Sequence, residues 1–245
     1  MCTLSVITRD NGYHLAMNRD ERLTRGDAIP PSKVDLGRTT AVYPRDGAGG
    51  TWVAANNHGI ALALLNWNDV PQPSMEKTRS RGDVIPALIG VASQDEVQKA
   101  LQKLDLQGIW PFRLVGVFSA EKRIGEWRWN QQTMESQFYD WKPQHWFSSS
   151  LSDEQASAQR GEVCAAAWNL EDAGSLPWLR RLHTSHANGP GPFSLCVHRE
   201  NVGTLSYTEI VCTAEEVRCH YIDGSPCAMR EVESVVTMER DPGSA

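Results

Sequence analysis

The chain has 245 residues, of which 40% are hydrophobic and 22% are charged, so it is long enough to bury one sizeable core. Its net charge of -6, with lysine and arginine scattered along the chain, argues against a nucleic-acid interface. No apolar run reaches the roughly 18–20 residues that a membrane span needs, and no secretory signal precedes the first strand. We therefore expect a cytoplasmic protein with a single domain over residues 1–245.

Two β-hairpins open the chain. Asn11-Gly12 and His58-Gly59 are two-residue turn signals, each flanked by strand-like segments. The predicted strands of these hairpins are residues 3–8, 13–18, 51–57 and 60–66. Between the hairpins, residues 23–45 are polar and contain two adjacent prolines, so we expect a loop with at most one short strand.

Helix signals follow in two groups, and two of the helices open with a capping box, Ser93-x-x-Glu96 and Ser152-x-x-Gln155. The predicted helices are residues 85–92, 93–104, 152–168 and 176–183. The predicted later strands are residues 112–119, 126–130, 193–198, 204–212 and 217–221. The resulting order β, α, β, α, β, with strands in hairpins, indicates an α+β sandwich with helices in the outer layers.

The amino end carries the most informative residues for chemistry. The predicted first turn places Cys2 opposite Glu21 and diagonal to Arg19, with all three side chains on one face of the sheet. Asp20 then points to the other face. A guanidinium beside a thiol favours the thiolate, which is the reactive form of cysteine.

Cys2 becomes the first residue if the initiator Met1 is removed, and we expect removal because cysteine is small. An N-terminal cysteine carries a nucleophilic thiol and an α-amine that acts as its base, and this pair suffices for acyl transfer. The alternative is a solvated loop at residues 18–21 behind a chance Met-Cys start.

Of the six cysteines, the five other than Cys2 are expected to be free, buried thiols in a reducing compartment. Cys212 and Cys219 are placed to face each other across a hairpin, although nothing requires a bond. Cys196-x-His198 and Cys219-His220 look like ligand pairs, but two isolated pairs do not make a closed tetrahedral shell. We therefore predict no metal site.

The start Met-Cys-Thr followed by Asn-Arg-Asp-Glu at residues 18–21 resembles the NRDE family, also called the transport and Golgi organisation family. Further matches are Gly-Gly-Thr-Trp at residues 49–52, Asn66 after an apolar strand and Ser-Arg-Gly at residues 80–82. The matches cover the first third of the chain well, and those later in the chain are looser.

NRDE proteins are similar to the N-terminal nucleophile hydrolases, especially the branch with bile-salt hydrolases and penicillin V acylase. The resemblance implies a four-layer αββα sandwich of antiparallel sheets and Cys2 as nucleophile and base. In that branch a strand with Arg-Asn-x-Asp orients the nucleophile, and Asn18 and Asp20 match its last two polar positions. Met17 stands where the arginine belongs, so Arg19, two residues on and on the same face, is expected to substitute.

The resemblance also concerns the oxyanion hole. Asn66 matches the asparagine region associated with it, but the branch has Thr-Asn-Ser-Pro where this chain has Ser149 in place of the asparagine. Losing one oxyanion donor costs about 10²–10³ in rate. Relatives often have Gly-Thr-Arg-Ser where this chain has Leu205 in place of the arginine, so a second cation is missing.

NRDE proteins are associated with haem trafficking and with acyl-coenzyme A, ligands that join a large apolar body to anionic groups. The residues expected to line a site for such a ligand are Asn18, Arg19, Glu21, Trp52, Trp67, Arg81 and Ser149. No cofactor is required, and haem would be a carried ligand, since no C-x-x-C-H motif and no axial histidine can be named. Two hypotheses stay open, namely a carrier, which the two departures favour, and a cysteine hydrolase or acyltransferase acting on amide, ester or thioester bonds. The oligomeric state is not indicated.

Overall fold

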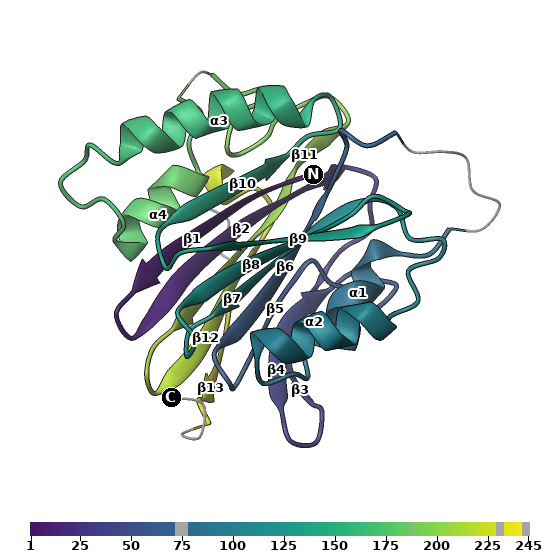
Figure 1. The fold of residues 1–245 in the computed structure, drawn as a ribbon. Coiled ribbons are helices and arrows are strands. Elements are labelled where there is room, and N and C mark those ends of the chain that lie inside the picture. The colour runs from purple at the N-terminus through teal and green to yellow at the C-terminus, as the bar shows by residue number, and fades with distance from the viewer. Residues whose placement is uncertain (72–77, 188, 229–232, 242–245) are drawn as a thin grey trace.

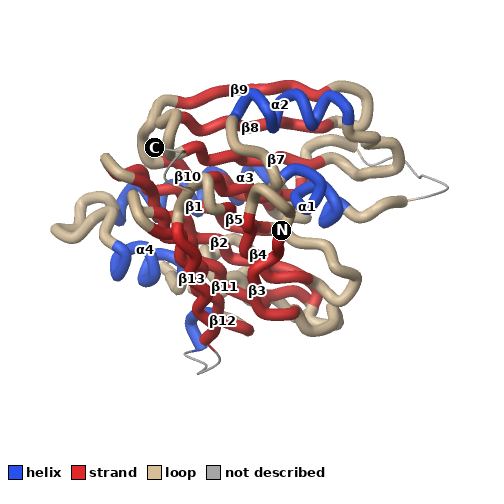
Figure 2. The backbone as a smooth tube through the Cα atoms, turned by 90° about the horizontal axis from the view of Figure 1, so that it is seen from below, coloured by secondary structure: helices blue, strands red, loops and turns tan. Residues whose placement is uncertain are grey.

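The computed structural model describes residues 1–71, 78–187, 189–228 and 233–241. Two antiparallel sheets pack face to face, with helices on both outer faces (Figures 1 and 2). This confirms the α+β class and the four-layer αββα sandwich. Within the described residues, no helix is long and apolar enough to span a membrane.

In the described part of the chain, the first sheet has six strands in the order β10-β1-β2-β11-β12-β13. These strands and the helices on their outer face are β1 Cys2–Arg9, β2 Gly12–Arg22, β10 Gln144–Ser148, β11 Val202–Cys212, β12 Glu216–Asp223, β13 Glu233–Glu239, α3 Asp153–Ala167 and α4 Leu176–His183. Trp178 and Leu179 of α4 pack with Ile7 and Ala16 of the sheet in one buried cluster. A short 3-10 helix, η2 Pro226–Ala228, follows β12.

The second sheet has seven strands in the order β3-β4-β5-β6-β7-β8-β9, counted over the same described ranges. These strands and the helices on their outer face are β3 Ile29–Asp35, β4 Thr40–Arg45, β5 Val53–Asn56, β6 Ile60–Asn66, β7 Phe112–Phe118, β8 Arg123–Trp129, β9 Met134–Tyr139, α1 Val84–Leu88 and α2 Gln94–Lys103. Leu88 and Leu101 of the helices pack with Leu62 and Leu114 of the sheet. A 3-10 helix, η1 Arg81–Asp83, precedes α1.

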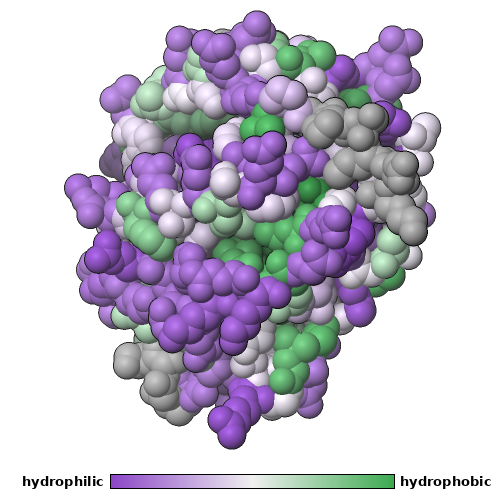
Figure 3. Space-filling view, turned by 45° about the vertical axis from the view of Figure 1, so that its right-hand side comes forward, coloured by the Kyte–Doolittle hydropathy of each residue, from purple (hydrophilic) through white to green (hydrophobic). Residues whose placement is uncertain are grey.

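The central core lies between the two sheets. Side chains alternate along a strand, so each strand sends every second residue into this layer, and Leu4 and Leu15 of the first sheet meet Ala63 and Val115 of the second. Cys2 belongs to the same cluster. On the face seen in Figure 3 hydrophilic side chains dominate, and apolar ones gather near the middle.

The register of the first hairpin differs from the sequence prediction by two residues. The two turn residues are Asp10 and Asn11, so Cys2 lies directly opposite Arg19, and Glu21 lies beyond the end of β1. A shift of two residues preserves the alternation of side chains. The predicted sharing of one face by Cys2 and Arg19 is therefore confirmed, while the pairing of Cys2 with Glu21 is wrong.

The close approach of a neighbouring strand accounts for the glycine at position 12. Gly12 belongs to β2 and has a φ of +147°, a backbone angle that residues other than glycine rarely adopt. A Cβ at Gly12 would collide with the carbonyl oxygen of Cys212 in β11. Glycine is thus required here by packing between strands and does not form part of the turn.

The predicted helices are confirmed, together with the serine half of each predicted capping box, while the Glu96 carboxylate accepts the N–H of Ala92 at 2.8 Å in place of that of Ser93. Ser93 Oγ accepts the Glu96 N–H at 3.2 Å, and Ser152 Oγ accepts the Gln155 N–H at 3.1 Å. Residues 23–45 contain the two strands β3 and β4 where we expected a loop with at most one.

Three further strands, β9, β10 and β13, were not predicted, and the strand predicted at residues 193–198 does not form. β9 is mostly exposed and polar, so its sequence lacks the apolar alternation of a core strand; β10 and β13 were missed too. Residues 193–198 form turns and bends with a single bridge from His198 to Gly203. Cys219 lies opposite Ile210, so it does not face Cys212.

Candidate functional site

Cys2 begins β1 and points into the layer between the sheets. Its side chain is 6% exposed, and its neighbours across the sheet are Arg19 in β2 and Ser148 in β10. The main-chain N–H of Cys2 donates a hydrogen bond to Ser148 Oγ at 3.0 Å. Ser148 was not predicted as a site residue, although it belongs to the serine-rich segment compared with the oxyanion residues.

Arg19 is held in place by an aromatic ring from the second sheet. Its guanidinium carbon lies 4.4 Å from the centre of the Trp52 ring, a cation–π contact that is strengthened by burial. Both side chains are buried. The structure therefore brings together Cys2, Arg19 and Trp52, as the sequence predicted.

A β-bulge and a small cavity lie beside Arg19. The pairing of β11 with β2 shifts between Thr204 and Ser206, which leaves Leu205 as the extra residue. Bulges are common next to active sites because they redirect side chains. A cavity of about 180 Å³ is lined by Arg19, Leu23, Arg25, Gly26, Asp27, Ala28, Leu205, Asp223 and Gly224.

Arg81 and Glu21 lie on the same side of the molecule as Cys2. Burial lowers the pKa of Arg81, and the charges of Cys2 and Glu21 act against this change. Although burial raises the pKa of Glu21, the backbone N–H of Arg22 and nearby cations bring it below its usual value. One Arg81 guanidinium nitrogen donates to the carbonyl of Pro111 at 3.1 Å.

Asn18 and Asp20 lie on the opposite face of β2, beneath α3 and α4. Asn18 Nδ2 donates to the carbonyls of His183 at 2.9 Å and Leu195 at 2.8 Å. Asp20 Oδ1 accepts the hydroxyl of Thr204 at 2.6 Å. The side chains of Asn18 and Asp20 therefore anchor the helix-covered side of β2 and do not share the face of the Cys2 thiol.

Arg160 of α3 contacts the strand that carries Cys2, and the sequence analysis did not predict it. It is fully buried and donates to the carbonyl of Cys2 at 3.3 Å and to Thr3 Oγ1 at 2.9 Å. Its Nη2 lies 3.6 Å from Asp20 Oδ2. The spacing of Ala156, Arg160 and Cys164 by four residues, all buried, is the signal that would have placed this charge on the inner face of the helix.

The electrostatic surroundings keep the Cys2 thiol protonated while Met1 is attached. Burial raises the pKa of the Cys2 thiol, and the charge of Asp20 raises it further, against the N-terminal ammonium and Arg19. Burial also raises the pKa of Asp20, against the opposing charges of Arg160 and the ammonium. The Met1 ammonium donates to the Asp20 carbonyl at 3.0 Å, and the Asp20 N–H donates to the Met1 carbonyl at 2.9 Å.

Asn66 and Ser149 are used locally in this structure. Asn66 ends β6 opposite Phe112, and alternation directs its side chain to the side of Leu64, away from the layer that contains Cys2. The Ser149 N–H donates to Asp153 Oδ1 at 2.6 Å, next to the start of α3. Neither side chain has a contact with Cys2 among the interactions of the described residues.

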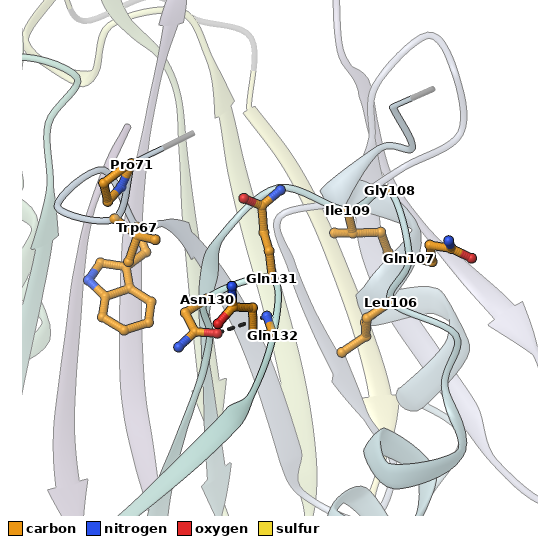
Figure 4. A pocket seen from close by; sticks show the side chains of 10 residues that line it. Trp67, Pro71, Leu106, Gln107, Gly108, Ile109, Asn130, Gln131 and Gln132 are labelled. Atoms are coloured by element: carbon orange, nitrogen blue, oxygen red, sulfur yellow. Dashed lines mark hydrogen bonds between the residues drawn. The ribbon is translucent and has the colours of Figure 1, made fainter. Parts of the chain in front are cut away.

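Trp67 lines a larger cavity, of about 620 Å³. Figure 4 shows Trp67 and Pro71 on one side and Leu106 and Ile109 on the other, with Asn130 to Gln132 between them. The lining residues are Trp67, Val70, Pro71, Leu106, Gln107, Gly108, Ile109, Asn130, Gln131 and Gln132. The main-chain N–H of Trp67 donates to the Pro111 carbonyl at 3.3 Å. The same oxygen accepts from the Arg81 guanidinium.

The family model described as Transport and Golgi organisation 2 (TANGO2) matches residues 1–172. This chain belongs to that family. A search of curated proteins found no match for the TANGO2-family chain.

Among solved structures, the chain is similar to penicillin V acylase from Agrobacterium tumefaciens, with a TM-score of 0.56 and 13% identity over 98% of this chain and 86% of that one. It is also similar to a mutant of conjugated bile acid hydrolase from Clostridium perfringens, with a TM-score of 0.54 and 11% identity over 97% of this chain and 92% of that one. A second variant of that hydrolase has a TM-score of 0.54 and 10% identity over 98% of this chain and 96% of that one. At this identity the likeness shows that the TANGO2-family chain has the fold of N-terminal nucleophile hydrolases.

Proposed function

We propose that this protein is a cysteine hydrolase or acyltransferase of the N-terminal nucleophile type, acting on amide, ester or thioester bonds. The observation that carries the proposal is the placement of Cys2 at the start of β1, directly opposite Arg19 and on the face between the sheets. The shared fold with penicillin V acylase and conjugated bile acid hydrolase supports the same chemistry.

Removal of Met1 would prepare the site. The nitrogen of Cys2, already 3.0 Å from Ser148 Oγ, would become a free α-amine next to its own thiol. The main-chain N–H and C=O of Asp20 would lose their Met1 partners. They would then be free to hydrogen-bond a substrate beside Cys2.

The reaction divides into two acyl transfers. The thiol proton moves to the α-amine, and the thiolate sulfur forms a bond to the substrate carbonyl carbon while the carbonyl electron pair moves to oxygen. When this intermediate collapses, the bond to the leaving group breaks, and the leaving group takes the proton from the ammonium. Water, deprotonated by the amine, then attacks the thioester and releases the acid and the thiol. Arg19 stabilises the thiolate. Asn66, which the family resemblance assigns to the oxyanion hole, is proposed to act through its backbone, because its side chain lies on the outer face of β6.

The Cys2→Ala variant tests this function. With a panel of acyl amides, esters and thioesters of increasing chain length, the variant is expected to lose kcat/KM by about 10³-fold or more, because the nucleophile is gone. Cys164→Ala, which removes a buried thiol in α3, is the control and should keep the rate. Equal rates for Cys2→Ala and the unaltered chain, or a panel that the unaltered chain does not turn over, would refute the proposal.

A second function, binding of haem or an acyl-coenzyme A-type ligand, is favoured by a separate observation. The cavity of about 620 Å³ that Trp67 lines lies in the size range of small-molecule sites. Arg81 shares the Pro111 carbonyl with Trp67. We propose that the apolar body of such a ligand contacts Trp67 and that Arg81 meets an anionic group.

Binding is measured by titrating haem, and separately palmitoyl-coenzyme A, and following tryptophan fluorescence. Saturable binding is expected, with affinity lowered about 10-fold or more in Trp67→Ala, because an aromatic anchor that a ligand covers contributes about 1.4 kcal/mol or more. The control is Trp168→Ala, at the end of α3 and outside the lining residues. No saturation with either ligand, or equal losses in both variants, would remove this second function.

A further inference from the structure

We propose that this protein binds one zinc ion through His186, Cys196, His198 and Cys227. Each of these residues offers one ligand atom, and the four atoms all lie within 4.8 Å of one another. Two thiolate sulfurs and two imidazole nitrogens form a ligand set of tetrahedral structural zinc sites. This cluster lies on the helix-covered side of the first sheet and is separate from the Cys2 thiol.

The distances between the ligand atoms agree with a tetrahedral centre. With zinc–sulfur bonds of about 2.3 Å and zinc–nitrogen bonds of about 2.05 Å, tetrahedral geometry separates two sulfurs by about 3.8 Å and a sulfur from a nitrogen by about 3.6 Å. The sulfurs of Cys196 and Cys227 are 3.5 Å apart, and His198 Nε2 is 3.3 Å from the Cys227 sulfur and 3.7 Å from the Cys196 sulfur. These three ligand atoms therefore already lie close to tetrahedral separations, and the His186 ligand atom lies within 4.8 Å of each of them.

His186 provides an independent indication that a ligand is bound here. Its ring lies against that of His198, with centroids 4.8 Å apart and planes at 65°. Its Nε2 is buried and has no hydrogen-bond partner among the described residues. A buried polar atom without a partner destabilises a fold, and coordination of a metal by this imidazole would remove that cost.

The fold brings two further ligands, His186 and Cys227, to the pair Cys196 and His198. The sequence shows Cys196-x-His198 and Cys219-His220 as two isolated pairs, from which we predicted no metal site. The N–H of Cys196 donates to the carbonyl of Ser185 at 3.4 Å, which brings His186 to the pair. Cys227 arrives on η2, where the neighbouring Ser225 hydroxyl donates to the Thr204 carbonyl at 2.8 Å.

The site would be structural, because four protein ligands leave no coordination position for a substrate. Its ligands lie in the segment that braces β2 from behind. The Leu195 carbonyl accepts from Asn18, and the Val197 N–H donates to Thr204 Oγ1 at 2.8 Å, the hydroxyl that bonds Asp20. A zinc ion would thus fix the loop that holds Asn18 and Asp20 on the side of β2 opposite to the Cys2 thiol.

Metal content tests the site directly, without any measurement of activity. The full chain, expressed with zinc in the medium and washed with a weak chelator, is unfolded, and the released zinc is measured with a chromogenic chelator. About one equivalent per chain is expected, falling at least 10-fold in Cys227→Ser and in His186→Gln. Cys164→Ser and His58→Gln alter a thiol and an imidazole outside the cluster and should keep the full equivalent.

Cobalt substitution reports the geometry. Tetrahedral Co²⁺ with two thiolates gives strong visible d–d bands and a near-ultraviolet sulfur-to-cobalt charge-transfer band, both expected in the full chain and lost in Cys227→Ser. Substoichiometric zinc in the reduced full chain, an octahedral cobalt spectrum, or zinc content unchanged in the Cys196→Ser/Cys227→Ser variant would overturn the proposal. A disulfide between Cys196 and Cys227 that persists in reductant would overturn it as well.

Discussion

Arg160→Met is expected to lower the free energy of unfolding by about 3–5 kcal/mol, because it leaves a buried carboxylate without its cation. Arg160 and Asp20 are both buried, with nitrogen and oxygen 3.6 Å apart. The variant also removes the donors to the Cys2 carbonyl and to Thr3. Urea denaturation measures the change, which is a large fraction of the stability of a typical domain.

An exposed ion pair provides the matched control. Arg181 and Asp172 form a bridge on the surface, with side chains 57% and 43% exposed, so Arg181→Met should cost less than about 1 kcal/mol. In the Arg160→Met/Asp20→Asn double variant the loss should be smaller than the sum of the two single losses, since the stranded charge is absent. A loss below about 1 kcal/mol for Arg160→Met would contradict the assignment of Arg160 as the support behind Cys2.

Acidification is expected to destabilise the protein steeply below pH 6.5. Burial lowers the pKa of His145 to about 4 and that of His183 to about 3, from about 6.5 in the unfolded chain. The unfolded state therefore binds more protons between these values, so stability is full above pH 6.5 and is lost as the pH falls towards 4 and then 3. Each histidine changes the free energy of unfolding by at most about 1.4 kcal/mol per pH unit. The pair therefore changes it by at most about 2.7 kcal/mol per pH unit.

Both histidines are buried against one hydroxyl, since Ser5 Oγ lies 2.8 Å from His145 Nδ1 and 2.9 Å from His183 Nε2. Denaturation between pH 6.5 and 5 measures the slope, and this range avoids the titration of most carboxylates. The His145→Gln/His183→Gln variant should have a distinctly flatter slope, while His58→Gln, at the second hairpin turn and away from Ser5, should keep it. A slope unchanged in the double variant would show that other groups cause the acid sensitivity.

The alternation of side chains made the main face of the site predictable. The placement of Cys2 with Arg19, and of Asp20 on the other face, survives the two-residue error in register because the pattern repeats every two residues. The turn was predicted one residue too late because Gly12 belongs to β2, where it packs against Cys212 of another strand. A contact between segments 200 residues apart leaves no local signal.

The parts that the sequence did not predict are those that depend on tertiary structure or carry little apolar pattern. β9 is an edge strand with mostly exposed side chains, so it has no buried face to reveal it. Arg160 pairs with Asp20 across 140 positions of sequence. The cluster of His186, Cys196, His198 and Cys227 likewise forms only after the loop before β11 meets η2.

The state of the Cys2 thiol and amine tests the central claim most directly. Intact-mass analysis of the purified chain, followed by incubation with an activated acyl ester and peptide mapping, should show complete loss of Met1. When turnover is stopped with acid, which protonates the α-amine and traps the thioester, a single hydroxylamine-sensitive acyl group should appear on Cys2 and be absent from Cys2→Ala. Retention of Met1, or acylation that spares Cys2 and falls on the partly exposed Cys227, would contradict the account.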